Sequence, residues 1–234
     1  MKSNVLIKFF ATCFLISVSF NSVTSQNLFG FTGLLTTPSA ETHHAGTFIG
    51  GAGYLPQVIL PRKDIWNYNT GTYHIDFFMF SFIELNMRMT LKQRSNGRYQ
   101  GQDRTSYVKI RVLKERDLLP ALAIGASDIA GSTNGWVSYF AVATKKIHGA
   151  WGYSSLTTGY YFPFGNEYYY KGLFGGITYT SPSIENIKFI AEYDSERFNL
   201  GVNVLLINHI SITAALCNME SASLGICYKT TLTR

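Results

Sequence analysis

The sequence predicts an all-β protein, a single antiparallel transmembrane β-barrel of about twelve strands, within a range of roughly ten to fourteen. Three observations predict this fold class: alternation of polar and apolar residues, an amino-terminal export signal, and connections that alternate in length. Residues 83–91 (IELNMRMTL) show the alternation best, since a strand would carry all their apolar side chains on one face. This length matches the roughly nine to eleven residues with which a tilted strand crosses a bilayer.

The export signal is expected in residues 1–25. Lys2 and Lys8 lie within the first eight residues, an apolar core follows at 9–20, and small residues end the segment at 23–25. This is the three-part layout of a cleavable signal peptide that is cut after Ser25. The apolar core is too short for a membrane-spanning helix, which needs about 20 apolar residues.

Two further regions are expected, an N-terminal segment at 26–46 and the barrel domain at 47–234. Charged residues make up 15% of the chain, against about 25% in a typical soluble domain. Removing residues 1–25 takes away two lysines and no acid, so the formal net charge falls from +6 to +4. No basic run accompanies this small excess, and we therefore expect no nucleic-acid partner.

The strands are expected where alternating or β-branched runs lie between turn-forming residues, and no segment shows helical periodicity. They are expected at 47–55, 72–80, 82–91, 104–115, 119–128, 135–145, 149–160, 172–181, 186–194, 197–205, 208–217 and 221–230.

The expected connections alternate between long and short. Those after the first, third, fifth and seventh strands are long, at 56–71, 92–103, 129–134 and 161–171, and the intervening ones are short. Outer-membrane barrels are built in this way, with long external loops and tight periplasmic turns. The pattern favours a barrel in the outer membrane of a Gram-negative cell.

Charged residues share one face of several expected strands. Along 104–115, Lys109 and Arg111 lie opposite Val108 and Ile110. In a membrane barrel the apolar face must meet lipid, because a charge there costs several kcal/mol at mid-bilayer. The charged face would then line the lumen. A secreted, soluble carbohydrate-binding β domain is the alternative, and its two faces would be reversed.

The candidate site is this charged lumen, with aromatic residues as stacking surfaces for sugars. The lumen residues are Arg104, Lys109, Arg111, Glu115, Asp128, Lys145, Glu192 and Asp194, and the stacking candidates are Trp136, Tyr139 and Trp151. Two interpretations stay open for the charges: they pair with one another and fill the interior, or they line a polar path for sugar hydroxyls. The three aromatic residues could equally belong to a girdle at the membrane boundary.

No catalytic set is expected. Ser95 lies in a predicted loop, but no histidine is spaced to act as its general base. The adjacent side chains of His43 and His44 diverge, and no cluster of cysteines or carboxylates supports them as metal ligands. We therefore expect a protein that is not an enzyme and has no metal site and no cofactor.

Several short motifs, in collinear order, carry a family resemblance. They are 33–40 (GLLTTPSA), 103–106 (DRTS), 118–125 (LLPALAIG), 128–131 (DIAG), 143–145 (ATK), 172–179 (GLFGGITY) and 191–194 (AEYD). Together they resemble the YjbH-type exopolysaccharide biosynthesis proteins, over about residues 30 to 230.

The resemblance implies an outer-membrane barrel that supports the production or secretion of an extracellular polysaccharide. It also implies the partners, namely outer-membrane lipid, polysaccharide and polysaccharide export proteins. A small passive pore or a purely structural barrel is the alternative function, and it would conduct ions without any preference for sugars.

Overall fold

The computed structural model describes residues 25–60, 68–93, 96–130, 137–149, 151–163 and 170–232, so the expected signal at 1–25 lies almost wholly outside the described residues. The strands are β1 (Thr47–Leu55), β2 (Thr70–Phe80), β3 (Ile83–Gln93), β4 (Tyr99–Leu113), β5 (Ala121–Ile129), β6 (Ser138–Gly149), β7 (Gly152–Pro163), β8 (Gly172–Thr180), β9 (Ile187–Tyr193), β10 (Phe198–Ile207), β11 (Ile210–Cys217) and β12 (Ser221–Thr231). A short 3-10 helix, Gln57–Ile59, follows β1. Among the described residues, no helix has the length and apolar character needed to cross a membrane.

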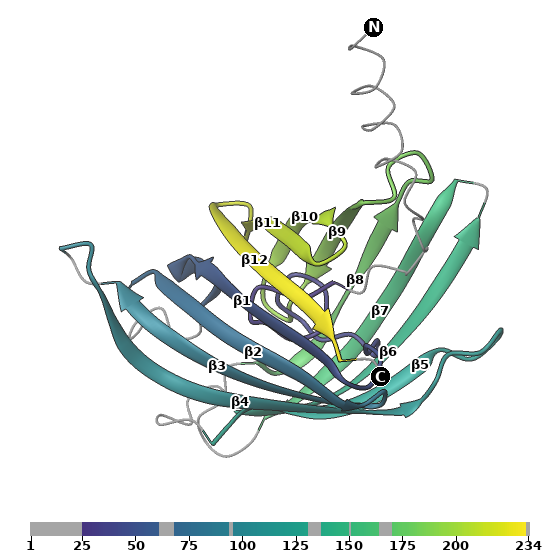
Figure 1. Ribbon diagram of the computed structural model, residues 1–234, viewed down its shortest axis with the longest axis horizontal. Coiled ribbons are helices and arrows are strands. Elements are labelled where there is room, and N and C mark those ends of the chain that lie inside the picture. The colour runs from purple at the N-terminus through teal and green to yellow at the C-terminus, as the bar shows by residue number, and fades with distance from the viewer. Residues whose placement is uncertain are drawn as a thin grey trace, which may run out of the picture.

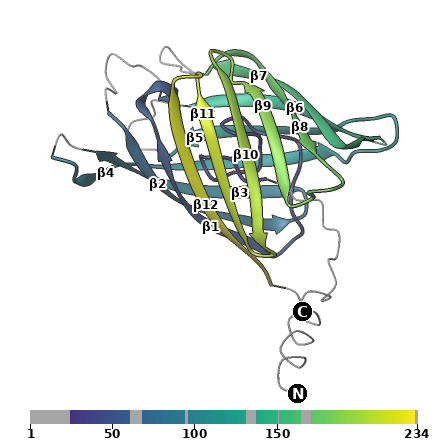
Figure 2. The ribbon, with the colours of Figure 1, turned by 90° about the horizontal axis from the view of Figure 1, so that it is seen from above.

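The twelve strands form one closed antiparallel barrel in sequence order, and β1 pairs with β12 to complete it (Figures 1 and 2). The expected fold class and strand number are confirmed. Closure leaves no strand edge without a partner, and this is what a sheet needs where no water can satisfy its backbone groups.

The two faces of the barrel wall have the polarity of a membrane barrel. On β3, the outward Met87 side chain is 69% exposed, whereas the inward Glu84 is fully buried. Glu84 is paired in register with Lys109 of β4, which is also fully buried. A soluble barrel would place its apolar side chains inside and its charges outside, so the structure contradicts the soluble alternative.

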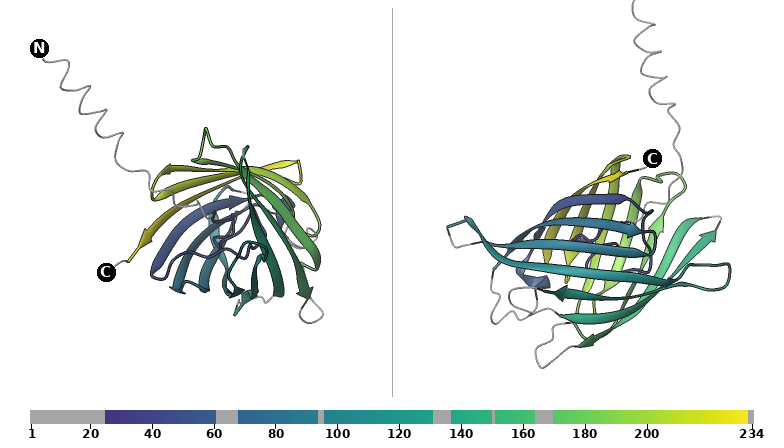
Figure 3. Two further views of the ribbon diagram at one scale, coloured as in Figure 1. Left: turned by 90° about the vertical axis from the view of Figure 1, so that its right-hand side faces the viewer. Right: turned by 60° about the horizontal axis from the view of Figure 1, so that its bottom comes forward.

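The connections alternate less strictly than the sequence suggests. The β3–β4 connection, expected at 92–103, is short because the strands continue to pair as far as Gln93 and Tyr99. The β4–β5 connection at 114–120 is correspondingly longer than expected. Strands β2–β4, β6 and β7 have 11 to 15 residues, whereas β8 to β11 have 7 to 10. The barrel walls therefore have unequal heights (Figures 1 and 3).

Residues 25–40 lie inside the barrel (Figures 2 and 3), and residues 41–46 lead from them to β1. We call residues 25–46 the plug. Every residue from 25 to 40 is buried, whereas none from 41 to 46 is. The segment folds back on itself through the isolated bridges Gln26↔Thr32 and Gly33↔Pro38. Gly33 is needed in this turn because a Cβ there would collide with the carbonyl oxygen of Thr37. The plug was not anticipated from the sequence, which predicted only an N-terminal segment.

Candidate functional site

Glu192 of β9 is the main anchor of the plug. Its carboxylate accepts backbone N–H bonds from Leu35 (2.9 Å), Thr36 (2.9 Å) and Thr37 (3.0 Å). The hydroxyls of Thr36 (2.6 Å) and Thr37 (2.9 Å) and the amide of Asn199 (2.9 Å) also donate to it. Successive backbone N–H groups make a natural anion site. The expected lumen carboxylate therefore lies inside the barrel, but its partner is the protein's own N-terminal segment.

A second anchor consists of a buried ion pair between Glu84 and Lys109. Lys109 Nζ lies 2.5 Å from Glu84 Oε2 and also donates to the carbonyl oxygen of Thr32 (3.2 Å). The backbone N–H of Thr32 donates to Glu84 Oε1. The pair therefore satisfies both backbone groups of Thr32. These additional hydrogen bonds stabilise the buried ion pair, which its Coulomb attraction alone need not do.

Stacked rings fill the space between plug and wall. Phe31 of the plug stacks on Tyr107 of β4, with ring centroids 4.1 Å apart and planes 1° from parallel. The Phe140 ring extends this cluster, and its centroid lies 5.6 Å from that of Tyr107. Tyr107 belongs to the face predicted to be charged, so inward-facing aromatic residues mark the lumen as well as the charges do.

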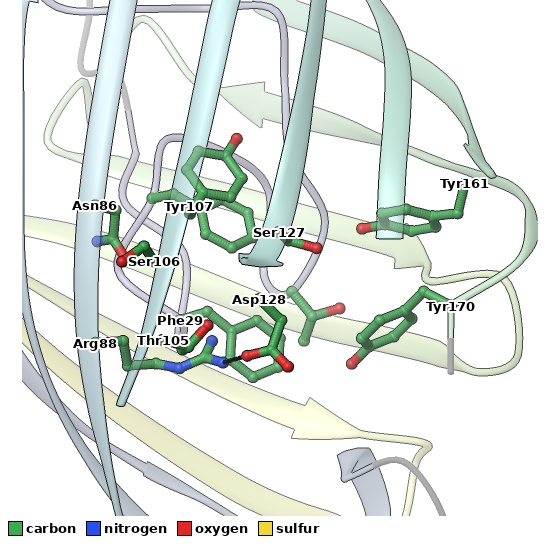
Figure 4. A pocket seen from close by; sticks show the side chains of 12 residues that line it. Phe29, Asn86, Arg88, Thr105, Ser106, Tyr107, Ser127, Asp128, Tyr161 and Tyr170 are labelled. Atoms are coloured by element: carbon green, nitrogen blue, oxygen red, sulfur yellow. Dashed lines mark ion pairs between the residues drawn. The ribbon is translucent and has the colours of Figure 1, made fainter. Parts of the chain in front are cut away.

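A small cavity remains beside the plug, between Phe29, Phe31 and the wall strands β3, β4 and β5 (Figure 4). Its volume is about 30 Å³, which is room for water but not for a sugar ring. Asp128 faces Arg88 there at 3.8 Å, and the Arg88 guanidinium lies 4.8 Å from the Phe29 ring centroid. We call this space the outer cavity.

Asp194 organises the β9–β10 turn at the rim above Glu192. Its Oδ1 accepts the backbone N–H groups of Glu196 (3.0 Å) and Arg197 (2.8 Å), and Arg197 Nη1 lies 3.7 Å from its Oδ2. Burial and the neighbouring Glu192 raise the pKa of Asp194, although Arg197 opposes the shift. Asp194 is thus a structural carboxylate of the turn.

Four of the eight expected lumen residues contact the plug or line the outer part of the lumen: Lys109, Asp128, Glu192 and Asp194. Arg111 also shares the inward face of β4, and its guanidinium donates to the carbonyl oxygen of Ser81 (2.9 Å).

The other three do not line the lumen. Arg104 is exposed and pairs in register with the outward Met89, because its position on β4 has the opposite parity to Lys109. Glu115 follows the end of β4, where it lies 3.2 Å from Lys145 at the rim. Lys145 lies on the face of β6 opposite to Thr144, whose hydroxyl accepts the backbone N–H of Ala40 in the lumen.

Two of the three expected stacking residues, Tyr139 and Trp151, lie outside the lumen. Trp136 is outside the described residues. Tyr139 is exposed on the outer wall, next to Phe162 in the sheet register. Trp151 is exposed in the β6–β7 turn, where its carbonyl oxygen accepts the hydroxyl of Tyr179 (2.7 Å). Both described residues have the positions of a girdle, which was the other interpretation of them.

No group of three or more His, Cys, Asp or Glu side chains in the described ranges could hold a metal ion. Ser95 lies outside those ranges.

The family model described as "Exopolysaccharide biosynthesis protein YbjH" (YjbH) matches residues 25–231. The chain belongs to the YjbH family. The match begins at the first described residue of the plug and ends at the last residue of β12, so plug and barrel together form the family unit. No curated protein matches this YjbH family member.

Solved structures share the fold at low sequence identity. A KdgM porin has a TM-score of 0.50 and 12% identity, over 80% of this chain and 99% of the porin. Outer membrane phospholipase A from Escherichia coli has a TM-score of 0.43 and 9% identity, over 82% of this chain and 99% of the phospholipase. The likeness to the porin shows the outer-membrane type of β-barrel fold and nothing about activity.

Proposed function

We propose that this YjbH family member is a non-catalytic barrel of the outer membrane that supports the production or secretion of an exopolysaccharide. In this proposal residues 1–25 are a cleaved signal peptide, the apolar outer wall meets lipid, and the partners are polysaccharide and its export proteins. The family supports the link to exopolysaccharide, and the porin-like fold supports the location.

The observation that carries the proposal is the plug. An open passive pore needs a water-filled lumen, whereas residues 25–40 are all buried within this one and are held there by Glu192, Glu84 and Lys109. A barrel filled in this way supports a role that depends on partners or on movement of the plug. This favours a component of export machinery over a small passive pore.

The test of the role is complementation. Deletion of the gene should lower the secreted exopolysaccharide, measured as total sugar in the medium, and the wild-type gene should restore it. Glu192→Gln should restore less, because it weakens the plug anchor, whereas Glu220→Gln in the exposed β11–β12 turn is the matched control. Unchanged output after deletion would refute the role.

Location and chemistry need separate measurements. The tagged protein should fractionate with outer membranes and shift on a gel when boiled in mild detergent. Purified protein incubated with the polysaccharide should generate no new reducing ends. New reducing ends would show that the protein is an enzyme and would refute the non-catalytic part of the proposal.

A further inference from the structure

Four basic side chains surround one end of the lumen, and they come from four strands distributed around the barrel. They are Arg111 of β4, Lys146 of β6, Lys188 of β9 and Lys229 of β12. Each lies on the inward face, two residues along its strand from a lumen residue: Lys109, Thr144, Ile190 or Cys227. This is the end at which β1 begins and β12 ends, and it is periplasmic in the usual orientation of outer-membrane barrels. We call these four residues the inner ring.

One carboxylate of the plug lies within the inner ring. Glu41 Oε1 is 2.9 Å from Lys146 Nζ, and its charge also acts on Lys188 and Arg111. Burial would raise the pKa of Glu41, but Lys188 and Lys146 outweigh burial and lower it. Lys109, the next cation inward, is already paired with Glu84.

His43 lies in the same positive electrostatic field. Burial lowers its pKa to about 3, and Lys229, Lys109 and Lys188 add to the shift. His43 is therefore neutral at physiological pH and adds no charge. Near the inner ring, Glu115 pairs with Lys145 at the rim and accepts the backbone N–H of Lys146 (2.8 Å). Glu41 is the carboxylate that forms an ion pair with the side chain of a ring residue.

At residues 41–46 the plug is less deeply buried than in residues 25–40. Residues 41–46 are half-buried or exposed, and the Glu41 side chain is 17% exposed. Their described polar side-chain contacts include the Glu41–Lys146 pair and a hydrogen bond from the Thr42 hydroxyl to the carbonyl oxygen of Ser81 (2.6 Å). The His43 ring also packs edge-on against Phe78, with centroids 4.9 Å apart, and this contact can stay in place when Glu41 moves. Glu41 can therefore leave the ring while Glu192 and Glu84 still hold residues 32–37.

We propose that the inner ring is a binding site for an anionic stretch of polysaccharide, in which carboxylate-bearing sugar units replace Glu41. The proposal rests on the proposed function, since it names the class of polymer that such a barrel would take from the periplasm. Rings of Arg and Lys select anions in membrane pores, and four cations around one lumen suit a polymer with repeated negative charges. In the absence of polymer, Glu41 acts as the internal anion.

The test measures binding of two defined probes to purified full-length mature protein in detergent, by isothermal titration calorimetry at low salt. The probes are an oligogalacturonate and a neutral maltooligosaccharide of the same length. Oligogalacturonate should bind, its affinity should fall as salt is raised, and the neutral probe should not bind. Equal binding of both probes would overturn the proposal.

Two variants should act in opposite directions. Lys188→Gln/Lys229→Gln should weaken oligogalacturonate binding about tenfold, because two partly exposed ion pairs are lost. Glu41→Gln should strengthen it several-fold, because it removes the internal competitor. Lys92→Gln is the matched control, since Lys92 lies far from the ring beside Tyr68 and carries the same charge. Weaker binding by Glu41→Gln, or an equal loss in Lys92→Gln, would overturn the proposal.

Heat-modifiability on a gel verifies the fold of each variant, and the single variant Lys229→Gln replaces the double one if the latter does not fold. These experiments use purified protein, so they separate the two proposals. Unchanged exopolysaccharide output after gene deletion refutes the proposed function, whereas loss of charge discrimination in vitro refutes the inner ring alone.

Discussion

The plug has two parts that differ in how the barrel holds them. Its body, residues 25–40, is buried throughout and is anchored by carboxylates that accept its backbone N–H groups. Its tail, residues 41–46, is half-buried or exposed and has one ion pair, Glu41–Lys146. A buried anchor cannot be lost without leaving donors or charges unsatisfied in a dry interior, whereas a partly exposed ion pair can exchange with water or another ion. The body is therefore a fixed part of the fold, and the tail is the part that can move.

Removal of the body's main anchor, Glu192, should have the largest effect on stability. Glu192→Gln should destabilise the protein by about 3–5 kcal/mol, because several buried donors lose a charged acceptor. It should also raise ion conductance in planar bilayers as the body loosens. Urea unfolding and single-channel recording measure the two effects. If Glu220→Gln had the same consequences, the anchor would have no special role.

Lys109→Met should have a comparable or slightly smaller effect. It leaves the Glu84 carboxylate buried without its cation, and breaking a buried pair from one side costs about 3–5 kcal/mol. Replacing both partners in Glu84→Gln/Lys109→Met should recover part of this loss. A double-mutant cycle of unfolding free energies measures the coupling. Additive single effects would show that the pair does not act as a unit.

Phe31→Leu tests the aromatic contacts of the body. The substitution keeps an apolar side chain but removes the stack on Tyr107, so the free energy of unfolding should fall by about 0.5–1.5 kcal/mol. Phe82→Leu, at an exposed outer position beside Phe80, provides the comparison and should change it less. A larger effect at Phe82 would reverse the ranking of the two rings.

The smallest effect is expected in the tail. Glu41→Gln should lower the unfolding free energy by only about 0.2–1 kcal/mol, since the pair with Lys146 is partly exposed. The folded-state pKa of Glu41 lies below its ordinary value of 4.5. The contribution is therefore complete above that value and is lost as the pH falls through the folded-state pKa. Wild type and variant should converge in urea unfolding at acidic pH. An effect as large as that of Glu192→Gln would abolish the distinction between tail and body.

Much of the barrel could be predicted from the order of residues alone. Strand parity follows from local chemistry, because each position on a strand faces either lipid or lumen, and this correctly placed Lys109, Arg111 and Glu192 inside. Parity also explains why Arg104 faces outward. It lies an odd number of residues from the inward Lys109 on β4, and it shares the outer face with its register partner Met89. Glu115 lies just beyond the end of β4, where rim and lumen cannot be separated without exact boundaries. Lys145 lies within β6 on the face opposite to the lumen residue Thr144, so its misplacement is again one of parity.

The plug could not be predicted in the same way. Residues 33–40 carry the family motif GLLTTPSA but no alternation. The partners of the plug are distant in sequence: Glu84 is 52 residues from Thr32, and Glu192 is 157 residues from Leu35. An irregular segment is specified by the donors and acceptors around it, and those come together only when the barrel closes. The same holds for the inner ring, since four strands contribute one cation each.

The sequence by itself determined the strands, the polarity of their two faces and the membership of the YjbH family, because alternation and collinear motifs are local properties of the chain. Only the tertiary structure decided what fills the lumen. A carboxylate such as Glu192 could have faced another side chain, water or a sugar. Its partner is a loop of the same chain, because closure of the barrel brings the two within hydrogen-bonding distance and burial makes any unsatisfied alternative costly.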